Sequence, residues 1–452
     1  MVAIRSWTCF VLVCVLGLIA AISAAAQSPQ AAGLAQGSAT SFGRHLKIKS
    51  FSVATTDNVL SYPSYFTGLD LPDEHSSLLP LWPWAGGAPD RGRTPYLLFT
   101  SSKVTASGMD GTVALETTDL TNFFPATALG YAEQVMSAPV VFNTCDGTHD
   151  LEFDENYAGA GSVLQGPTLP PGNLIMLYEA ENHCPGGTHQ ENFYATVGFA
   201  RSSDNGRTWP APVNSEFGNF ARHPVLKASV DEPATTFPVA LGDAIPSGFV
   251  DISALGEAYL YVTYTYHDGE TGDPGLSIRV ARARLGNIYR GFGNGWAPPL
   301  QFWKWYNGGF TQPGIGGLDS AVFPSTQCLG VTRMSEITRN DDLGLYMLIF
   351  VCSPSSVTST GERMAAWYYS TATSLELQDW TAPQPIAGSE SAFPSCPSSS
   401  GQVFDGFYPS FISPGAPAGH TRLTGLAFFL NGCDTGQPRA LSSRSFTITV
   451  EP

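Results

Sequence analysis

A Pro-Ser pair between apolar residues recurs along the chain and restricts the folds open to it. Four copies read "SYPSYF", "AIPSGFV", "VFPSTQ" and "FYPSFI", with the serines at Ser64, Ser247, Ser325 and Ser410. A fifth copy, "GAGSVL", places Ser162 at the spacing that the others predict. Successive serines lie about 80 to 100 residues apart, so we expect one structural unit to occur five times.

Each copy is followed by a second apolar run: "TPYLLFTSS", "NLIMLYEAE", "AYLYVTYTYHD", "LYMLIFVC" or "LAFFLNGC". Four units then end in a tail with the pattern strand, tight turn, aromatic residue, strand, which gives four antiparallel strands per unit. The fifth unit ends one strand short, and "HLKIKSFSVA" near the N-terminus supplies a strand that would complete it. The sequence predicts an all-β fold, a five-bladed β-propeller whose ring the N-terminal strand closes.

The composition agrees with this prediction and indicates an exported protein. Charged residues make up only 13% of the chain, while Gly and Pro number 47 and 34. Arg5 precedes an apolar run that ends in "AISAAAQ", the layout of a signal peptide. We expect a signal peptide over 1–26, a flexible lead-in over 27–43, and a single propeller domain over 44–452. The mature protein is expected to be a secreted monomer, extracellular or periplasmic.

The formal net charge of −16 argues against nucleic acid and anionic membrane as partners, because both attract basic surfaces. Six cysteines remain after the signal peptide, and no pair has the close spacing of a zinc site. In an exported protein this even set indicates disulfides. From their places in the repeat we expect the pairs Cys145–Cys184, Cys328–Cys352 and Cys396–Cys433.

The segment "RSSDNGRTWPAPV" suits a hairpin turn, with Asp204 accepting turn amides, Gly206 at positive φ and Trp209 packed between blades. It resembles the Asp-box of sialidases and other propeller proteins. The resemblance implies a turn between the third and fourth strands, on the face away from substrate. We therefore assign this segment to folding and not to chemistry.

Carboxylates stand upstream of every predicted first strand, at the side that would surround one mouth of the central channel. They are Asp57, Asp154 with Glu155, Asp243, Asp319 and Asp405. Each alone is explained equally well as a turn cap. Five such groups at one channel mouth would repel one another, shift their pKa values and favour a cation or a polar substrate.

The expected loops after the second strands add Glu179, Glu181 and His183, and also His267 with Asp268. Surface hydrogen bonding is the simpler role for the histidines, because the sequence has no zinc-binding His motif. Nucleophile-elbow and nucleotide-binding motifs are absent as well. We expect no cofactor and assign no metal ligand, although the acidic mouth leaves a calcium or sodium ion in the channel as an alternative.

Aromatic residues around such a mouth would stack on sugar rings, while carboxylates would bind hydroxyls or act as acid and base. The candidates are Trp82, Trp84, Trp303, Trp305 and Tyr306. Packing between blades is the other explanation for these side chains.

With five units, acidic residues before the inner strands and tails such as "STATSLELQDWTAPQPI", the chain resembles the five-bladed propeller glycosidases. These include arabinanases, xylosidases and fructan hydrolases. The resemblance implies a base or nucleophile at Asp57 and a residue that tunes pKa at Asp154 or Glu155. It implies a glutamic acid as proton donor in blade three, where this chain has Asp243, so Glu181 is a rival. Sialidases resemble it less, because they have six blades and an arginine triad.

We therefore expect a secreted glycoside hydrolase that acts on a polysaccharide or oligosaccharide. Its expected substrate-binding residues are Asp319, Asp405, His183, His267, Asp268 and Trp305. The alternatives are a carbohydrate-binding propeller without catalysis, a sialidase, and a polysaccharide lyase that uses His183, His267 and Tyr266.

Overall fold

The computed structural model divides the chain into two compact units, Met1–His45 and Leu46–Pro452. All described residues belong to the second unit. They are residues 46–60, 74–80, 96–103, 109–140, 144–145, 147–148, 152–165, 172–184, 193–209, 222–229, 241–253, 255–268, 276–287, 300–323, 330–354, 365–393, 406–431 and 440–451. The predicted signal peptide and lead-in lie outside them.

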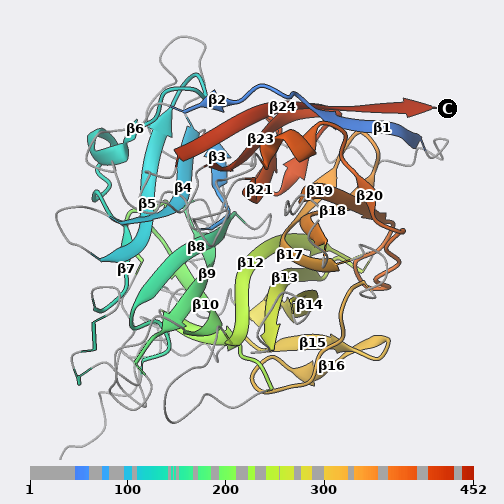
Figure 1. Cartoon of the computed structure of the whole chain (residues 1–452). Helices are drawn as coiled ribbons and strands as arrows, with labels where there is room; N and C mark the ends of the chain where they lie inside the picture. The colour runs from blue at the N-terminus through green and yellow to red at the C-terminus, as the bar shows by residue number, and fades with distance from the viewer. Residues whose placement is uncertain are drawn as a thin grey trace, which may run out of the picture. The chain divides into compact units, whose positions relative to one another are not determined.

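Regular structure in the described ranges consists of β-strands (Figure 1) and short 3-10 turns, with no α-helix. This agrees with the all-β prediction. Accordingly, these ranges contain no helix of the length and apolarity that a membrane span requires.

The first sheet has the strand order β3-β4-β5-β6, and β7 pairs with β5. Its strands are β3 (Ser77–Pro80), β4 (Tyr96–Lys103), β5 (Asp110–Thr117), β6 (Phe124–Pro125) and β7 (Met136–Ser137). Strand β4 is the predicted run "TPYLLFTSS". It is buried over residues 97–102 because it lies between β3 and β5.

Two antiparallel sets of strands form a nine-stranded sheet. The first set is β8 (Tyr157–Leu164), β9 (Leu174–Asn182), β10 (Tyr194–Ser202) and β11 (Arg222–Leu226). The second is β12 (Leu241–Ile252), β13 (Ala258–Asp268), β14 (Ser277–Arg284), β15 (Phe302–Tyr306) and β16 (Gly309–Pro313). Among the described strands, a two-residue parallel pairing of β10 with β12 joins the sets, at Tyr194 and Ala195.

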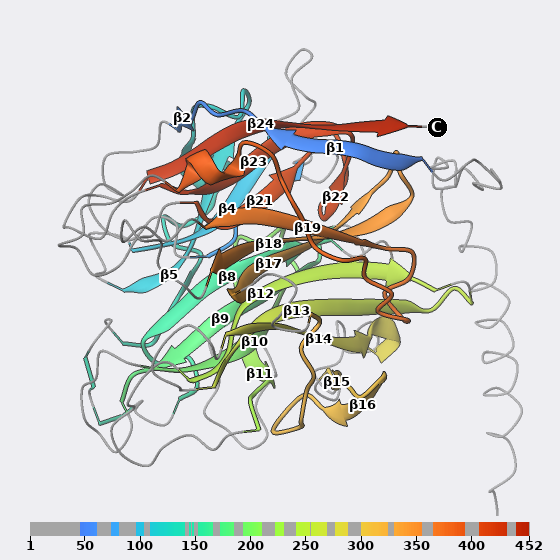
Figure 2. The ribbon, with the colours of Figure 1, turned by 45° about the vertical axis from the view of Figure 1, so that its right-hand side comes forward.

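The two remaining sheets have five strands each. One contains β17 (Gly330–Asn340), β18 (Leu345–Pro354), β19 (Ala366–Ala372), β20 (Gln384–Pro385) and β22 (His420–Thr421). The other contains β1 (Lys47–Val53), β2 (Asn58–Val59), β21 (Phe407–Ile412), β23 (Thr424–Asn431) and β24 (Ala440–Glu451). Strand β1 pairs antiparallel with β24, as predicted for "HLKIKSFSVA", and Figure 2 shows the two strands side by side.

The repeated serine has a structural role that the sequence did not reveal. Each unit has one strand, here called the inner strand, that carries a serine or glutamate at this position. The side-chain oxygen of that residue accepts a backbone N–H from the next inner strand, or from the residue just before it. The bonds run from Val163 N to Ser77 Oγ (2.9 Å), Gly248 N to Ser162 Oγ (3.0 Å), Ile337 N to Ser247 Oγ (3.1 Å), Phe411 N to Glu336 Oε2 (2.5 Å) and Ser76 N to Ser410 Oγ (2.9 Å). These bonds join β3, β8, β12, β17 and β21 in a cycle.

The register of four of these strands shifts next to the accepting residue, between Ala160 and Ser162 and at the same place in β12, β17 and β21. Such a β-bulge turns a side chain away from its ordinary direction. The bulge therefore explains how the serine side chain reaches the neighbouring strand.

In two units the strand that joins the cycle is not the predicted one. "SYPSYF" lies outside the described residues, and the cycle uses Ser77 of β3 instead. "VFPSTQ" also lies outside them apart from its first two residues, and β17 supplies Glu336. In these two units the cycle therefore uses β3 and β17 and not the predicted segments, since Ser77 and Glu336 supply the accepting oxygens.

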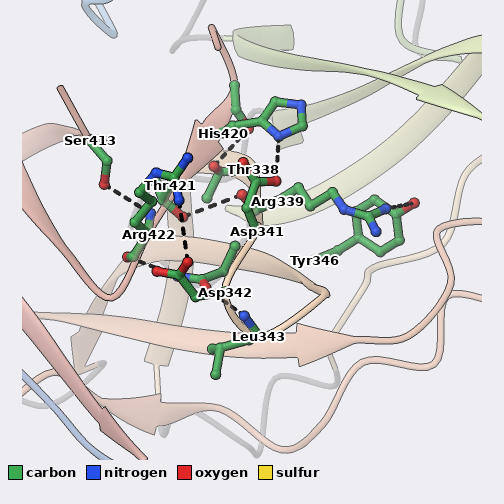
Figure 3. A network of polar contacts seen from close by, with 12 residues as sticks. Thr338, Arg339, Asp341, Asp342, Leu343, Tyr346, Ser413, His420, Thr421 and Arg422 are labelled. Atoms are coloured by element: carbon green, nitrogen blue, oxygen red, sulfur yellow. Dashed lines mark hydrogen bonds and ion pairs between the residues drawn. The ribbon is translucent and has the colours of Figure 1, made fainter. Parts of the chain in front are cut away.

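A group of polar contacts fastens β22 to β17, as Figure 3 shows. His420 Nδ1 lies 2.7 Å from Asp341 Oδ1, and Thr338 Oγ1 donates to Gly419 O at 2.7 Å. The backbone of Leu423 donates to Asp342 Oδ2 at 2.9 Å. These contacts join the turn after β17 to the segment between β21 and β23.

The turn after β10 has the predicted local geometry. Asp204 Oδ1 accepts the backbone N–H of Thr208 at 3.0 Å, and Gly206 has a φ of 81°. Trp209 is buried and meets Phe99 of the first sheet edge to face, with ring centroids 6.3 Å apart. This segment therefore contributes to packing between two sheets.

Candidate functional site

Three glutamates meet near the cycle of inner strands. Glu74 lies three residues before Ser77, while Glu179 and Glu181 lie two residues apart on β9. Alternate residues of a strand point to the same face, so the last two side chains share one face of β9. Their placement within β9 corrects the expectation that they lie in a loop. Glu74 is completely buried, and Glu179 and Glu181 are 4% and 8% exposed.

The carboxyl of Glu179 is hydrogen-bonded to both other glutamates. Its contact with Glu74 lowers the pKa of Glu179, and its contact with Glu181 raises it. A bond that stabilises the charged form lowers the pKa of a carboxyl. The backbone N–H of Ile245 donates to Glu179 Oε2, at 2.9 Å.

Burial raises the pKa of Glu179 from 4.5 to about 8, and the neighbouring Glu181 adds to the increase. A carboxyl with this pKa keeps its proton at neutral pH. It can act as a proton donor while a neighbouring carboxylate stays charged, which is the division of roles that acid-base catalysis by two carboxyls requires.

His183 contacts Glu181, the last of the three glutamates, which are called the glutamate row from here on. Its Nε2 lies 2.7 Å from Glu181 Oε2, and its ring packs against Phe193 with centroids 5.3 Å apart. The predicted residues Glu181 and His183 are thus direct neighbours. His183 is buried, in contrast to the surface role that the sequence allowed.

Two further histidines are His75, buried shortly before β3, and His267, partly buried near the end of β13. Burial lowers the pKa of His75 to about 4, and burial together with the charge of Arg333 lowers that of His267 to about 4. Both imidazoles are therefore neutral near pH 7. The guanidinium of Arg333 stacks on Phe407 with its carbon 4.5 Å from the ring centroid.

Asp57 does not stand before an inner strand. It precedes β2, which pairs with β24, and its Oδ1 accepts from Arg444 Nε. The predicted position of Asp57 is wrong because "NVL" supplies a short edge strand in the last sheet.

Asp154 and Glu155 precede β8, as predicted, and both are completely buried. Asp154 forms an ion pair with Arg222 of β11 and accepts a hydrogen bond from Tyr178 at 3.0 Å. Burial raises the pKa of Asp154, and the Arg222 guanidinium opposes that increase. The pair joins the first and fourth strands of one unit.

Asp243 and Asp319 meet around a buried lysine. Lys304 Nζ lies 2.8 Å from Asp243 Oδ2 and 3.5 Å from Asp319 Oδ2. Tyr264 also donates to Asp319, at 2.8 Å. Burial raises the pKa of Asp243 to about 6, and Lys304 opposes the increase. This network connects β12 to β15, so it holds the sheet together.

The remaining predicted positions are only partly described. Asp268 is the last residue of β13 and pairs with Leu241, but its side chain is outside the described part. Asp405, Trp82 and Trp84 lie outside it altogether. Trp305 lies in β15 and meets Phe310 of β16 at 5.0 Å between ring centroids, so the β15–β16 hairpin accounts for its packing.

The disulfide between Cys145 and Cys184 is present, with the Cα atoms 5.6 Å apart. Cys352 is also disulfide-bonded. Its predicted partner Cys328, and the predicted pair Cys396 and Cys433, lie outside the described residues.

Sequence reasoning missed Glu74, and it mentioned Glu179 without assigning it a role. The signal for Glu74 was present in "EHSSLLP", a carboxylate shortly before a serine and an apolar run. The more conspicuous "SYPSYF" obscured it. Within the described ranges no group of three or more His, Cys, Asp or Glu is arranged to hold a metal ion.

No protein-family model matches the chain, and no curated protein matches it. Solved structures of glycoside hydrolases are similar to it. One is the catalytic domain of the Coprinopsis cinerea GH62 α-L-arabinofuranosidase, with 14% identity, 87% of this chain and 98% of that chain covered, and a TM-score of 0.41. An endo-1,4-β-xylanase from Bacteroides thetaiotaomicron has 11% identity, with 88% and 97% covered and a TM-score of 0.40.

A third similar structure is an exo-β-1,3-galactanase from Phanerochaete chrysosporium with β-1,3-galactotriose, at 13% identity and a TM-score of 0.40. The similarity covers 87% of this chain and 64% of that one. All three are glycoside hydrolases, the class that the sequence resemblance named. At TM-scores below 0.5 they carry no conclusion about the activity of this chain.

Proposed function

We propose that this protein is a secreted glycoside hydrolase in which Glu179 is the proton donor and Glu181 is the carboxylate that acts as base or nucleophile. The observation that carries the proposal is the row of three hydrogen-bonded glutamates, in which Glu179 retains its proton to about pH 8. Glycosidic cleavage uses one protonated and one charged carboxyl, and this row offers both.

The positions of the two residues on β9 suit this division. They are two residues apart on one strand face, which places their Cα atoms about 6.6 Å apart. In the free protein their carboxyls share a hydrogen bond. Glycosidic cleavage requires carboxyls about 5 to 9.5 Å apart, so a bound sugar would have to separate the two side chains. Glu74, which is completely buried, supports Glu179 from behind.

The proposed scaffold is a five-bladed propeller with one channel. The cycle of five hydrogen bonds between inner strands supports five blades, and the pairing of β1 with β24 supports closure by the N-terminal strand. In such a ring the start of β3 and the end of β9 lie at the same mouth of the channel. That mouth would receive the glycan.

The first test is to incubate the purified protein with a panel of plant, algal and cell-wall glycans and to measure new reducing ends. We expect the wild type to release them and Glu181→Gln to release at least about 1,000-fold fewer. Binding without new reducing ends would indicate a carbohydrate-binding propeller. New ultraviolet absorbance from an unsaturated product would indicate a lyase. Either result would contradict hydrolysis.

A further inference from the structure

The end of β9 is fastened to the segment before β8 by contacts around one buried side chain, Asn156. Its Oδ1 accepts the backbone N–H of His183 at 2.8 Å, and its Nδ2 donates to Thr144 O at 3.0 Å. Its own backbone N–H donates to Glu181 O at 3.0 Å. Asn156 therefore fixes the backbone of Glu181 and of His183, the two residues at one end of the glutamate row.

The Cys145–Cys184 disulfide closes the same junction covalently. It joins the residue after Thr144 to the residue after His183, so the two bonds to the Asn156 amide lie beside the cross-link. The backbone N–H of Cys184 also donates to Asn182 Oδ1 at 2.8 Å. Asn156, His183 and Cys184 are all completely buried, so water does not compete for these bonds.

These contacts affect the Glu181 side chain through the imidazole of His183. The His183 ring is fixed on one side by Phe193 and presents Nε2 to Glu181 Oε2 at 2.7 Å. Glu181 is in turn hydrogen-bonded to Glu179. The direction of the Glu181 carboxylate therefore depends on where the backbone of His183 is held.

We propose that His183 is a positioning residue that holds Glu181 toward Glu179, and that the Cys145–Cys184 disulfide keeps His183 in place. This inference rests on the proposed function for its effect on rate, but the positioning itself is independent of any reaction. Reduction by a dithiol converts the disulfide to two thiols and the reagent to its own disulfide. The covalent link between the two segments, here called the tether, is then lost, while both cysteine residues remain.

The test is a pH titration of the glutamate side-chain carboxyls by ¹³C NMR on the full mature chain, with the Glu179 resonance assigned by its loss in Glu179→Gln. In His183→Ala the Glu181 carboxylate loses its orientation, so it raises the pKa of Glu179 less strongly. We expect the Glu179 midpoint to fall by about one pH unit or more. His183→Gln keeps an N–H donor of similar reach and should stay within about 0.3 units of the wild type.

The cysteine variants test the tether. Cys145→Ser combined with Cys184→Ser should lower the Glu179 midpoint as His183→Ala does. Cys352→Ser, which removes another disulfide, should leave it unchanged. If His183→Ala does not fold, His183→Asn replaces it, because asparagine is too short to reach Glu181. Near-ultraviolet circular dichroism verifies the fold of each variant.

Kinetics then separate this inference from the proposed function. If the wild type hydrolyses a glycan, His183→Ala should lower kcat about 10- to 100-fold, as loss of an orienting partner does at other sites, with little change in KM. If the wild type hydrolyses none, the proposed function fails, while a shifted Glu179 midpoint still supports the positioning. An unchanged midpoint in folded His183→Ala overturns the role of His183. An unchanged midpoint in the double cysteine variant overturns the tether.

Discussion

Lys304 Nζ lies 2.8 Å from Asp243 Oδ2 in the interior of the sheet formed by β12 to β16, and both side chains are completely buried. Asp319 also lies within 3.5 Å of the same ammonium group. A buried lysine between two carboxylates is a structural connection, because each charge is compensated by its neighbours and none is directed toward solvent. Asp243 and Asp319, which were expected at the channel mouth, therefore belong to this structural network.

Removal of this lysine should destabilise the protein strongly. Lys304→Met leaves two buried carboxylates without their cation, and breaking a buried pair in this way costs about 3 to 5 kcal/mol. Urea unfolding monitored by tryptophan fluorescence measures the change. The control is Lys47→Met, which removes an exposed lysine 3.6 Å from Glu451 and should change the free energy of unfolding by less than about 1 kcal/mol. Equal effects of the two variants would contradict the assignment.

The rate of glycan hydrolysis should fall at alkaline pH. Glu179 must be protonated to donate, and burial raises its pKa to about 8, so kcat/KM should decrease above about pH 8. Stability follows the same group. Its folded pKa is raised above the ordinary 4.5, so its contribution is present below pH 4.5 and is lost as the pH rises through about 8.

Melting temperatures of wild type and Glu179→Gln between pH 5 and 9 measure the stability effect. We expect the loss of stability toward pH 9 to be smaller in the variant, because glutamine has no proton to lose. If the melting temperature of Glu179→Gln falls as much toward pH 9 as that of the wild type, other groups cause the loss of stability.

Glu336 should behave as a neutral member of the inner-strand cycle. It occupies the place of a repeated serine and accepts the backbone N–H of Phe411 at 2.5 Å. Burial raises the pKa of Glu336 well above its ordinary value. Glu336→Gln keeps a neutral accepting oxygen, so we expect stability at pH 6 to change by less than about 1 kcal/mol.

Glu336→Ala leaves the amide of Phe411 without this acceptor and should cost about 1 to 3 kcal/mol. Calorimetry at pH 6 compares the two variants. A glutamine variant as unstable as the alanine variant would mean that the charge of Glu336, and not its accepting oxygen, supports the cycle.

The contact between Asp341 and His420 in Figure 3 should contribute modestly and should weaken in acid. Burial would raise the pKa of Asp341, but the hydrogen bond to His420 and the nearby positive charges outweigh it and lower the pKa. Its stabilising contribution is therefore present above the ordinary pKa of 3.8 and is lost as the pH falls below that value. Both side chains are more than a quarter exposed, so Asp341→Asn should cost about 0.2 to 1 kcal/mol at pH 7. Thermal melting at pH 7 and pH 3 measures the difference, which should be smaller at pH 3.

The sequence was most informative where a local pattern corresponds to a local structure. The second apolar runs became β4, β9, β13, β18 and β23, and Asp204 accepts the turn amide that its spacing indicated. The disulfide between Cys145 and Cys184 also followed from the places of the two cysteines in the repeat. In each of these cases the neighbouring residues in the sequence determine the role of the residue.

Features that depend on the meeting of distant segments could not be predicted in the same way. The pairing of Asp57 with Arg444 joins residues that are 387 positions apart, and no local pattern distinguishes it from a channel carboxylate. Glu74, which precedes β3, meets Glu179 of β9 only through the tertiary arrangement of two different units. The assignment of each carboxylate to a structural or a chemical role therefore required the tertiary structure.

The most direct measurement is the rate of reducing-end release by Glu179→Gln and Asp57→Asn, each relative to the wild type, on a glycan that the wild type hydrolyses. The proposed site predicts a loss of at least about 1,000-fold for Glu179→Gln and a rate within about threefold of wild type for Asp57→Asn. The reverse pattern, with Glu179→Gln active and Asp57→Asn inactive, would contradict the assignment of catalysis to the glutamate row.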